Sequence, residues 1–167
     1  QRQMCIRDRH GPDGGDEINV VDFVNVKDIP NYGWPISSYG KHYYEEKNDS
    51  RLEQSPLEKS HKKKGFIEPI KYFVPSVGIS QIIGLPKQFT NTNNLQFIVG
   101  TMGTAKKIKE GMLSLYFFEY NNSENKIINE KLIPIKSRVR DIKYLSKYNS
   151  VVMFLETNST IGVLKKK

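Results

Sequence analysis

A histidine, three glycines, a proline and two carboxylates lie within a short run near the start of the chain, His10–Asp16 (HGPDGGD). Gly11, Pro12, Gly14 and Gly15 prevent a regular strand or helix here and allow a ligand to approach main-chain oxygens closely. Oxygen ligands, backbone carbonyls among them, suit a hard cation such as Ca²⁺. A glycine-rich turn before a strand is the simpler interpretation, and the residues by themselves favour it.

Two arginines, Arg138 and Arg140, occupy alternate positions near the other end of the chain. Alternate residues of a strand share a face, so the two guanidinium groups are expected to point the same way. Guanidinium groups bind carboxylates bidentately, which suits a polyanionic ligand. The same spacing also fits a cationic stripe on a solvated surface, and the spacing alone favours that stripe.

The chain resembles a known family, the soluble pyrroloquinoline-quinone-dependent aldose sugar dehydrogenases, also called the glucose/sorbosone dehydrogenase family. The segments that carry the resemblance come in the family's order and together extend over most of the chain. They are HGPDGGDEIN (10–19), NYGWPISSYGKHY (31–43), VPSVGIS (74–80), FIVGTMG (97–103) and SRVRDI (137–142).

The resemblance implies an all-β fold, a six-bladed β-propeller of which this chain is a C-terminal fragment of about three blades with antiparallel four-stranded sheets. It implies a pyrroloquinoline quinone held by Ca²⁺, an aldose sugar oxidised at C1 by hydride transfer, and an external electron acceptor. Family members are usually exported, which implies a periplasmic or secreted protein. The family's general-base histidine lies upstream of the HGP motif and no residue here matches it, so we expect this chain alone to be inactive.

Residue by residue, the resemblance gives the motif positions their roles. The carbonyls of Gly11 and Pro12 match calcium-binding main-chain positions. Asp16 matches a carboxylate of the substrate pocket. Positions that contact the cofactor are matched by His10, Ser76, Arg138 and Arg140.

Two positions depart from the family pattern. Gly103 stands where the family often has a lysine that approaches the quinone, and the nearby Lys106 and Lys107 are expected to be displaced into a loop. Val74 stands where a pocket tryptophan is frequent. These departures keep a second hypothesis open, in which a non-catalytic propeller binds a glycan or a protein partner.

Short apolar runs separated by turn-forming residues indicate many strands and few helices. The expected strands are 18–24, 70–74, 77–85, 95–101, 112–120, 126–133, 139–145, 151–156 and 160–164. Strand signals about 8–15 residues apart are typical of a sandwich, a barrel or a propeller. At roughly 40–50 residues for each blade, residues 10–167 suffice for about three blades.

Residues 1–9 (QRQMCIRDR) show neither strand alternation nor helix periodicity, and they resemble translated sequencing-adapter DNA. We interpret them as a probable non-native remnant and assign residues 10–167 to the propeller, although an ordinary frayed terminus is the alternative. They contain the single cysteine, Cys5. No internal disulfide framework and no cysteine-ligated metal cluster is therefore expected.

Residues 41–65 are rich in charge and poor in apolar side chains, which predicts a long exposed loop. The formal net charge of +8 and the basic run 61–64 raise a third hypothesis, nucleic-acid binding. No aromatic stacking pattern accompanies the run, so we interpret it as a solvated loop and expect no nucleic-acid partner. His42 and His61, in the same polar stretch, are given no catalytic role.

Two further expectations concern single features. The NYGWP run (31–35) predicts a structural turn with Trp34 packed as a core aromatic. Every apolar stretch is interrupted well short of the roughly 18 residues that a spanning helix needs. No transmembrane segment is therefore expected.

Overall fold

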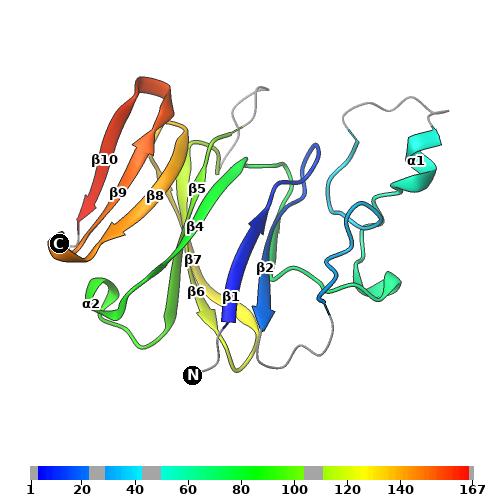
Figure 1. Ribbon diagram of the computed structural model, residues 1–167, viewed down its shortest axis with the longest axis horizontal. Helices are drawn as coiled ribbons and strands as arrows, with labels where there is room; N and C mark the ends of the chain where they lie inside the picture. The colour runs from blue at the N-terminus through cyan, green and yellow to red at the C-terminus, as the bar shows by residue number, and fades with distance from the viewer. Residues whose placement is uncertain (1–3, 23–28, 43–49, 104–110, 166–167) are drawn as a thin grey trace. The chain divides into compact units, whose positions relative to one another are not determined.

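The computed structural model describes residues 4–22, 29–42, 50–103 and 111–165 (Figure 1). The described residues fall into two compact units, of which the first ends at Ser76 and the second begins at Val77. The described residues form ten strands in three antiparallel sheets, and their helices are short, which confirms the all-β fold class. Each expected strand is found within two residues of its predicted ends, although residues 23–24 lie outside the described residues.

The first unit is built on a three-stranded antiparallel sheet with the order β1-β2-β3. Its strands are β1 (Met4–Arg9), β2 (Asp16–Asp22) and β3 (Lys71–Phe73). The central strand β2 is almost entirely buried. His61, from the described part of the connection to β3, lies against Glu17 of this strand and helps to cover one of its faces.

Strand β1 forms where the sequence showed no strand periodicity, so that interpretation was wrong. The reason is the partner: β1 pairs with β2 along its whole length, from Met4 opposite Asp22 to Arg9 opposite Glu17. Pairing with the buried strand β2 gives β1 its hydrogen bonds and buries side chains such as Ile6. The sequence of β1 alone did not indicate either. The non-native origin of residues 1–9 stays a prediction.

The predicted exposed loop, residues 41–65, is also wrong in part. Its described portion contains the short helix α1 (Ser50–Gln54) and the 3₁₀ turn η1 (Lys62–Lys64). Leu57 and His61 are buried, with 4% and 0% of their surface exposed. The segment folds back on residues 36–38, where Ser38 N–H donates to the carbonyl of Glu58 (3.0 Å). Residues 43–49 lie outside the described residues.

The NYGWP turn forms as expected, but its tryptophan is not a core residue. The N–H of Ser37 donates to the carbonyl of Gly33 (2.7 Å), which closes the turn. Trp34 is 53% exposed, and the guanidinium carbon of Arg9 lies 5.4 Å from its ring centroid. A cation over the indole face stabilises a surface tryptophan, because the ring's quadrupole attracts positive charge.

The second unit contains two antiparallel meanders (Figure 1). The four-stranded sheet has the order β4 (Ile79–Leu85), β5 (Leu95–Thr101), β6 (Ser114–Asn121) and β7 (Lys126–Pro134). The three-stranded sheet contains β8 (Val139–Leu145), β9 (Ser150–Leu155) and β10 (Thr160–Lys165). Short helical turns in the connections are α2 (Lys87–Thr90), η2 (Ser146–Tyr148) and η3 (Glu156–Asn158).

The core of this unit is shared by its two sheets. Its buried side chains come from α2, β5, β6, β8 and β9: Phe89, Ile98, Leu115, Val139, Ile142, Val151 and Met153. Polar side chains also join the sheets, since the hydroxyl of Ser80 donates to the carbonyl of Val139 (2.6 Å) and Ile142 N–H donates to the Gln81 side chain (2.6 Å). These contacts fix the start of β8, which contains Arg140 and directly follows Arg138.

Gly100 in β5 is expected to be required at the junction of the two sheets. A Cβ there would lie 2.7 Å from Ser80 Oγ and 2.9 Å from Val139 Cγ1. Gly100→Ala should therefore lower the free energy of unfolding by about 1–3 kcal/mol, as overpacked cores do. Gly84→Ala is the matched control, because its Cβ would meet only the Phe97 ring at an ordinary 3.5 Å.

Urea denaturation of both variants measures the difference. The control should be neutral or slightly stabilised, since a strand glycine replaced by alanine has less unfolded-state entropy to lose. Equal stability of the two variants would contradict the close packing of β5 on β8.

Candidate functional site

The loop between β1 and β2, His10–Gly15, is held by direct backbone contact with the segment around Gly40. Asp13 and Lys41 exchange two backbone hydrogen bonds of 3.0 Å each. A Cβ on Gly40 would lie 2.3 Å from the carbonyl oxygen of Gly14, a distance that real Cβ atoms do not adopt. The first two motif segments therefore meet in the first unit, and glycine is required at the contact.

A third motif segment approaches the same loop. The N–H of Gly15 donates to the carbonyl of Phe73 (2.8 Å), the last residue of β3. Val74 follows directly, and its methyl groups would lie 3.7 Å from a Cβ on Gly14. Val74 is 58% exposed and Ser76 is buried. The segment 74–76 thus begins beside the glycine loop.

Asp16 is the carboxylate around which the predicted residues of this loop gather. Its side chain is fully buried at the start of β2. Its Oδ1 atom accepts a hydrogen bond from the N–H of Gly11 (3.0 Å) and lies 3.6 Å from Nδ1 of His10, whose own side chain is half exposed. The structure therefore brings His10, Gly11 and Asp16 together.

The chemistry of this loop fits a hard cation. Among the described residues, no backbone N–H donates to the carbonyl oxygen of Gly11 or of Pro12. Asp16 adds a carboxylate to the same loop. The part of the chain that is described has no cluster of three or more His, Cys, Asp or Glu side chains suited to a metal. A cation here would therefore depend on main-chain oxygens, which Ca²⁺ accepts.

Arg138 and Arg140 meet at a single carboxylate in the second unit. The Nε atoms of Arg138 and Arg140 lie 3.1 Å and 3.3 Å from Oε2 of Glu156, and Nη2 of Arg140 lies 3.3 Å from Oε1. The pairing of β8 with β9 shifts between Val139 and Asp141, so Arg140 lies at a bulge. Both guanidinium groups contact the same carboxylate, so they lie on the same side of the chain at the start of β8.

A second motif segment lies beside these arginines. Nη1 of Arg140 is 3.0 Å from the sulfur of Met102, which belongs to the 97–103 segment. Gly103 follows with a φ of 71°, in the region that favours glycine. Lys106 and Lys107, expected in a displaced loop, lie outside the described residues. The last two motif segments therefore meet in the second unit.

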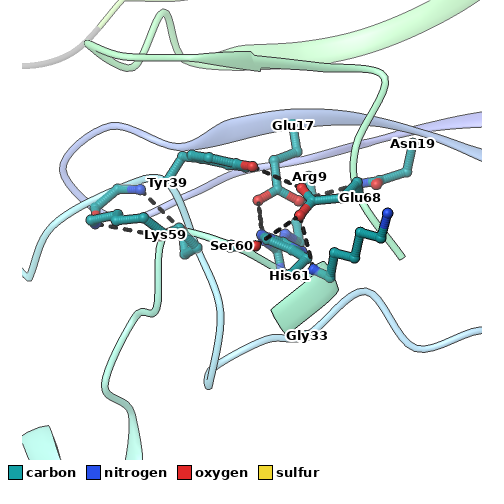
Figure 2. Close-up of polar contacts among 12 residues, drawn as sticks. Arg9, Glu17, Asn19, Gly33, Tyr39, Lys59, Ser60, His61 and Glu68 are labelled. Carbon is teal, nitrogen blue, oxygen red and sulfur yellow. Dashed lines mark hydrogen bonds and ion pairs between the residues drawn. The ribbon is translucent and has the colours of Figure 1, made fainter. Parts of the chain in front are cut away.

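A buried ionic cluster on the other face of β2 was missed by the sequence analysis. Figure 2 shows Glu17 directed at His61 and Arg9. Oε1 of Glu17 lies 2.7 Å from Nη2 of Arg9 and 3.3 Å from Nε2 of His61, and the side chains of Glu17 and His61 are fully buried. Burial raises the pKa of Glu17, an effect that the positive charges of Arg9 and His61 partly oppose.

The cluster continues to Glu68 through Tyr39 (Figure 2). The Tyr39 ring stacks on His61 with a centroid separation of 5.4 Å, and its hydroxyl donates to Glu68 Oε2 (2.7 Å). The N–H of Lys62 donates to Glu68 Oε1 (2.8 Å). Burial raises the pKa of Glu68, but these two hydrogen bonds and the charge of His61 outweigh it, so the net pKa is lowered.

One signal in the sequence could have pointed to this cluster. Glu17 stands in a run of strand-forming residues, and a carboxylate in a buried strand needs a cationic or hydrogen-bonding partner. The identity of the partner was hidden, because His61 lies in a segment whose composition resembles a solvated loop.

The comparisons with known proteins bear on the whole chain. The family model described as "Glucose / Sorbosone dehydrogenase" matches residues 2–164. The chain belongs to the glucose/sorbosone dehydrogenase family. This is a family of sugar dehydrogenases with a β-propeller fold, so the three antiparallel sheets are part of a propeller.

Two relatives show how much of the family's length is present. An uncharacterised protein of Synechocystis sp. is 26% identical over 134 residues, which cover 80% of this chain and 27% of that protein. A solved structure of a glucose dehydrogenase is 20% identical, with a TM-score of 0.65, and the match covers 97% of this chain and 40% of that one. This member of the glucose/sorbosone dehydrogenase family thus spans less than half of either relative. None of its described helices has the length and apolar character needed to cross a membrane.

Glu17 and Glu68 are expected to make opposite contributions to the pH dependence of stability. The pKa of Glu17 is raised above its ordinary 4.5, so the Glu17 carboxyl keeps its proton to a higher pH in the folded chain than in the unfolded chain. The contribution of Glu17 to the free energy of unfolding therefore falls as pH rises from 4.5 through the raised pKa. Glu68 has a lowered pKa, so its contribution is present above 4.5 and is lost as pH falls through the lowered value.

Urea denaturation between about pH 3.5 and pH 7 checks these signs, with Glu17→Gln and Glu68→Gln as a matched pair. Relative to the unchanged chain, the Glu17→Gln variant should gain stability as pH rises and the Glu68→Gln variant should lose it. The same slope for both variants would contradict the different environments assigned to the two carboxylates.

Proposed function

We propose that this chain is part of a quinoprotein that oxidises aldose sugars at C1, passing hydride to Ca²⁺-bound pyrroloquinoline quinone and electrons to an external acceptor. The family supports a sugar oxidoreductase. The observation that carries the finer proposal is the loop His10–Asp16, where the main-chain carbonyls of Gly11 and Pro12 offer oxygen ligands to a hard cation and the buried Asp16 supplies the carboxylate of the substrate pocket.

The chain's own residues have separate tasks in this proposal. The carbonyls of Gly11 and Pro12 hold the ion, and the glycine contact with Gly40 keeps both oxygens in place. Asp16, fixed by the N–H of Gly11, places a negative charge beside His10 at the pocket wall. When bound, the calcium–quinone pair supplies the hydride acceptor.

The remaining assignments follow from charge and hydrogen-bonding capacity. Arg138 and Arg140 bind carboxylates of the quinone, because two guanidinium groups on one side match a polycarboxylate. Ser76, which is buried, contributes a hydroxyl to the cofactor. The general base lies outside this chain, so the chain by itself is inactive. A calcium-dependent cofactor favours a periplasmic or secreted protein.

Dye reduction tests the proposal on the full-length protein that contains this chain. After treatment with a chelator, addition of Ca²⁺ and pyrroloquinoline quinone should restore sugar-dependent reduction of an artificial dye with at least one aldose. The 167-residue chain alone should give none, because the base is absent. No reduction with any aldose, together with no quinone binding, would support the non-catalytic propeller instead.

The arginine assignment has its own test. Arg140→Gln should weaken quinone binding roughly tenfold or more, since a hydrogen bond to a charged group contributes about 1.5–3 kcal/mol. Lys126→Gln is the control, because it removes the same charge from an exposed pair with Glu124. Calorimetric titration with pyrroloquinoline quinone measures the affinity of each variant. Equal quinone affinities of Arg140→Gln and Lys126→Gln would contradict the role of Arg140.

A further inference from the structure

The carboxylate of Glu156 occupies the arginine pair to which the proposed cofactor binds. It contacts both guanidinium groups through three atom pairs of 3.1–3.3 Å. This is the arrangement that a carboxylate of an anionic ligand would adopt on the same two groups. A ligand carboxylate that binds the Nε–H groups of both arginines must therefore replace the carboxylate of Glu156.

The side chain of Glu156 can leave without disturbing the turn that carries it. The turn η3 is tied to β8 by the main chain, since Glu156 N–H donates to the carbonyl of Arg138 (2.9 Å). The hydroxyl of Thr157 accepts from the N–H of Arg138 (3.0 Å). Neither bond uses the Glu156 carboxylate, so the side chain is free to change rotamer while the backbone stays in place.

The pair is also weak enough to be displaced. The side chains of Arg138, Arg140 and Glu156 are 38%, 50% and 35% exposed. Ion pairs that are open to solvent hold little net energy, because water and salt screen them. A ligand with several carboxylates can therefore displace the single carboxylate of Glu156 with a small loss of free energy.

We propose that Glu156 is an internal competitor for the carboxylate-binding site formed by Arg138 and Arg140, and that it sets the affinity of this site for polycarboxylate ligands. The inference rests on the proposed function for the identity of the natural ligand, the quinone. It predicts a sign: removing the charge of Glu156 strengthens anion binding. If Glu156 served instead to hold the arginines in position for the ligand, its removal would weaken binding.

Titration of the 167-residue chain with pyridine-2,6-dicarboxylate measures this sign. The side-chain Nε–H signals of the arginines, followed by NMR, report binding at the pair itself. Glu156→Gln should bind the dicarboxylate roughly three- to tenfold more tightly than the unchanged chain, the range expected for losing two solvent-exposed ion pairs. The gain should shrink in about 0.5 M salt, because screening removes the charge effect.

Glu124→Gln is the matched control, since it removes the same charge from the exposed pair with Lys126 in the turn between β6 and β7. It should leave the affinity within about twofold of the unchanged chain. Equal or weaker binding by Glu156→Gln would overturn the inference, as would failure of every variant to bind the dicarboxylate.

A parallel titration with pyrroloquinoline quinone separates this inference from the proposed function. A stronger dicarboxylate complex in Glu156→Gln, with no quinone binding in any variant, would leave the competitor role standing and refute the cofactor. Quinone binding that Glu156→Gln does not strengthen would refute the competitor role and leave the cofactor standing.

Discussion

Backbone contact between the glycine loop and Gly40 is the constraint on which the first unit depends. A Cβ on Gly15 would lie 2.3 Å from the backbone nitrogen of Gly40, and a Cβ on Gly40 would lie 2.3 Å from the carbonyl oxygen of Gly14, so a side chain at either position would collide with main-chain atoms. The loop can adopt this position because the neighbouring Asp13 and Lys41 exchange two backbone hydrogen bonds. The carbonyls of Gly11 and Pro12 and the buried Asp16 are placed as a consequence.

Strand β2 places two adjacent carboxylates in different environments. Successive side chains of a strand point to opposite faces, so Asp16 turns to the glycine loop and Glu17 turns to Arg9 and His61. Glu17 lies against Arg9 and His61, but these contacts only partly offset the cost of burying its carboxylate, so its pKa is raised. The cluster around Glu17 therefore ties β2 to the segment that contains His61, and its carboxylate is held at a cost in stability that grows with pH.

The sequence predicted what depends on local pattern. Alternating apolar residues and Asn-rich or Gly-containing turns placed the strands of both units, because side-chain alternation and turn chemistry act over a few residues. What depends on distant partners was missed: β1 forms only against β2, and His61 is buried only because the polar segment folds over Glu17. The alternation of Arg138 and Arg140 suggested a shared side, but the turn that brings Glu156 to them gave no sequence signal.

We propose above all that the main-chain oxygens of the glycine loop hold Ca²⁺ in a sugar-oxidising propeller. A crystal structure of the full-length protein grown with Ca²⁺, with an anomalous difference map, tests it most directly. We expect a single peak at about 2.3–2.6 Å from the carbonyl oxygens of Gly11 and Pro12. A loop without a peak, in a crystal that binds Ca²⁺ elsewhere, would contradict it.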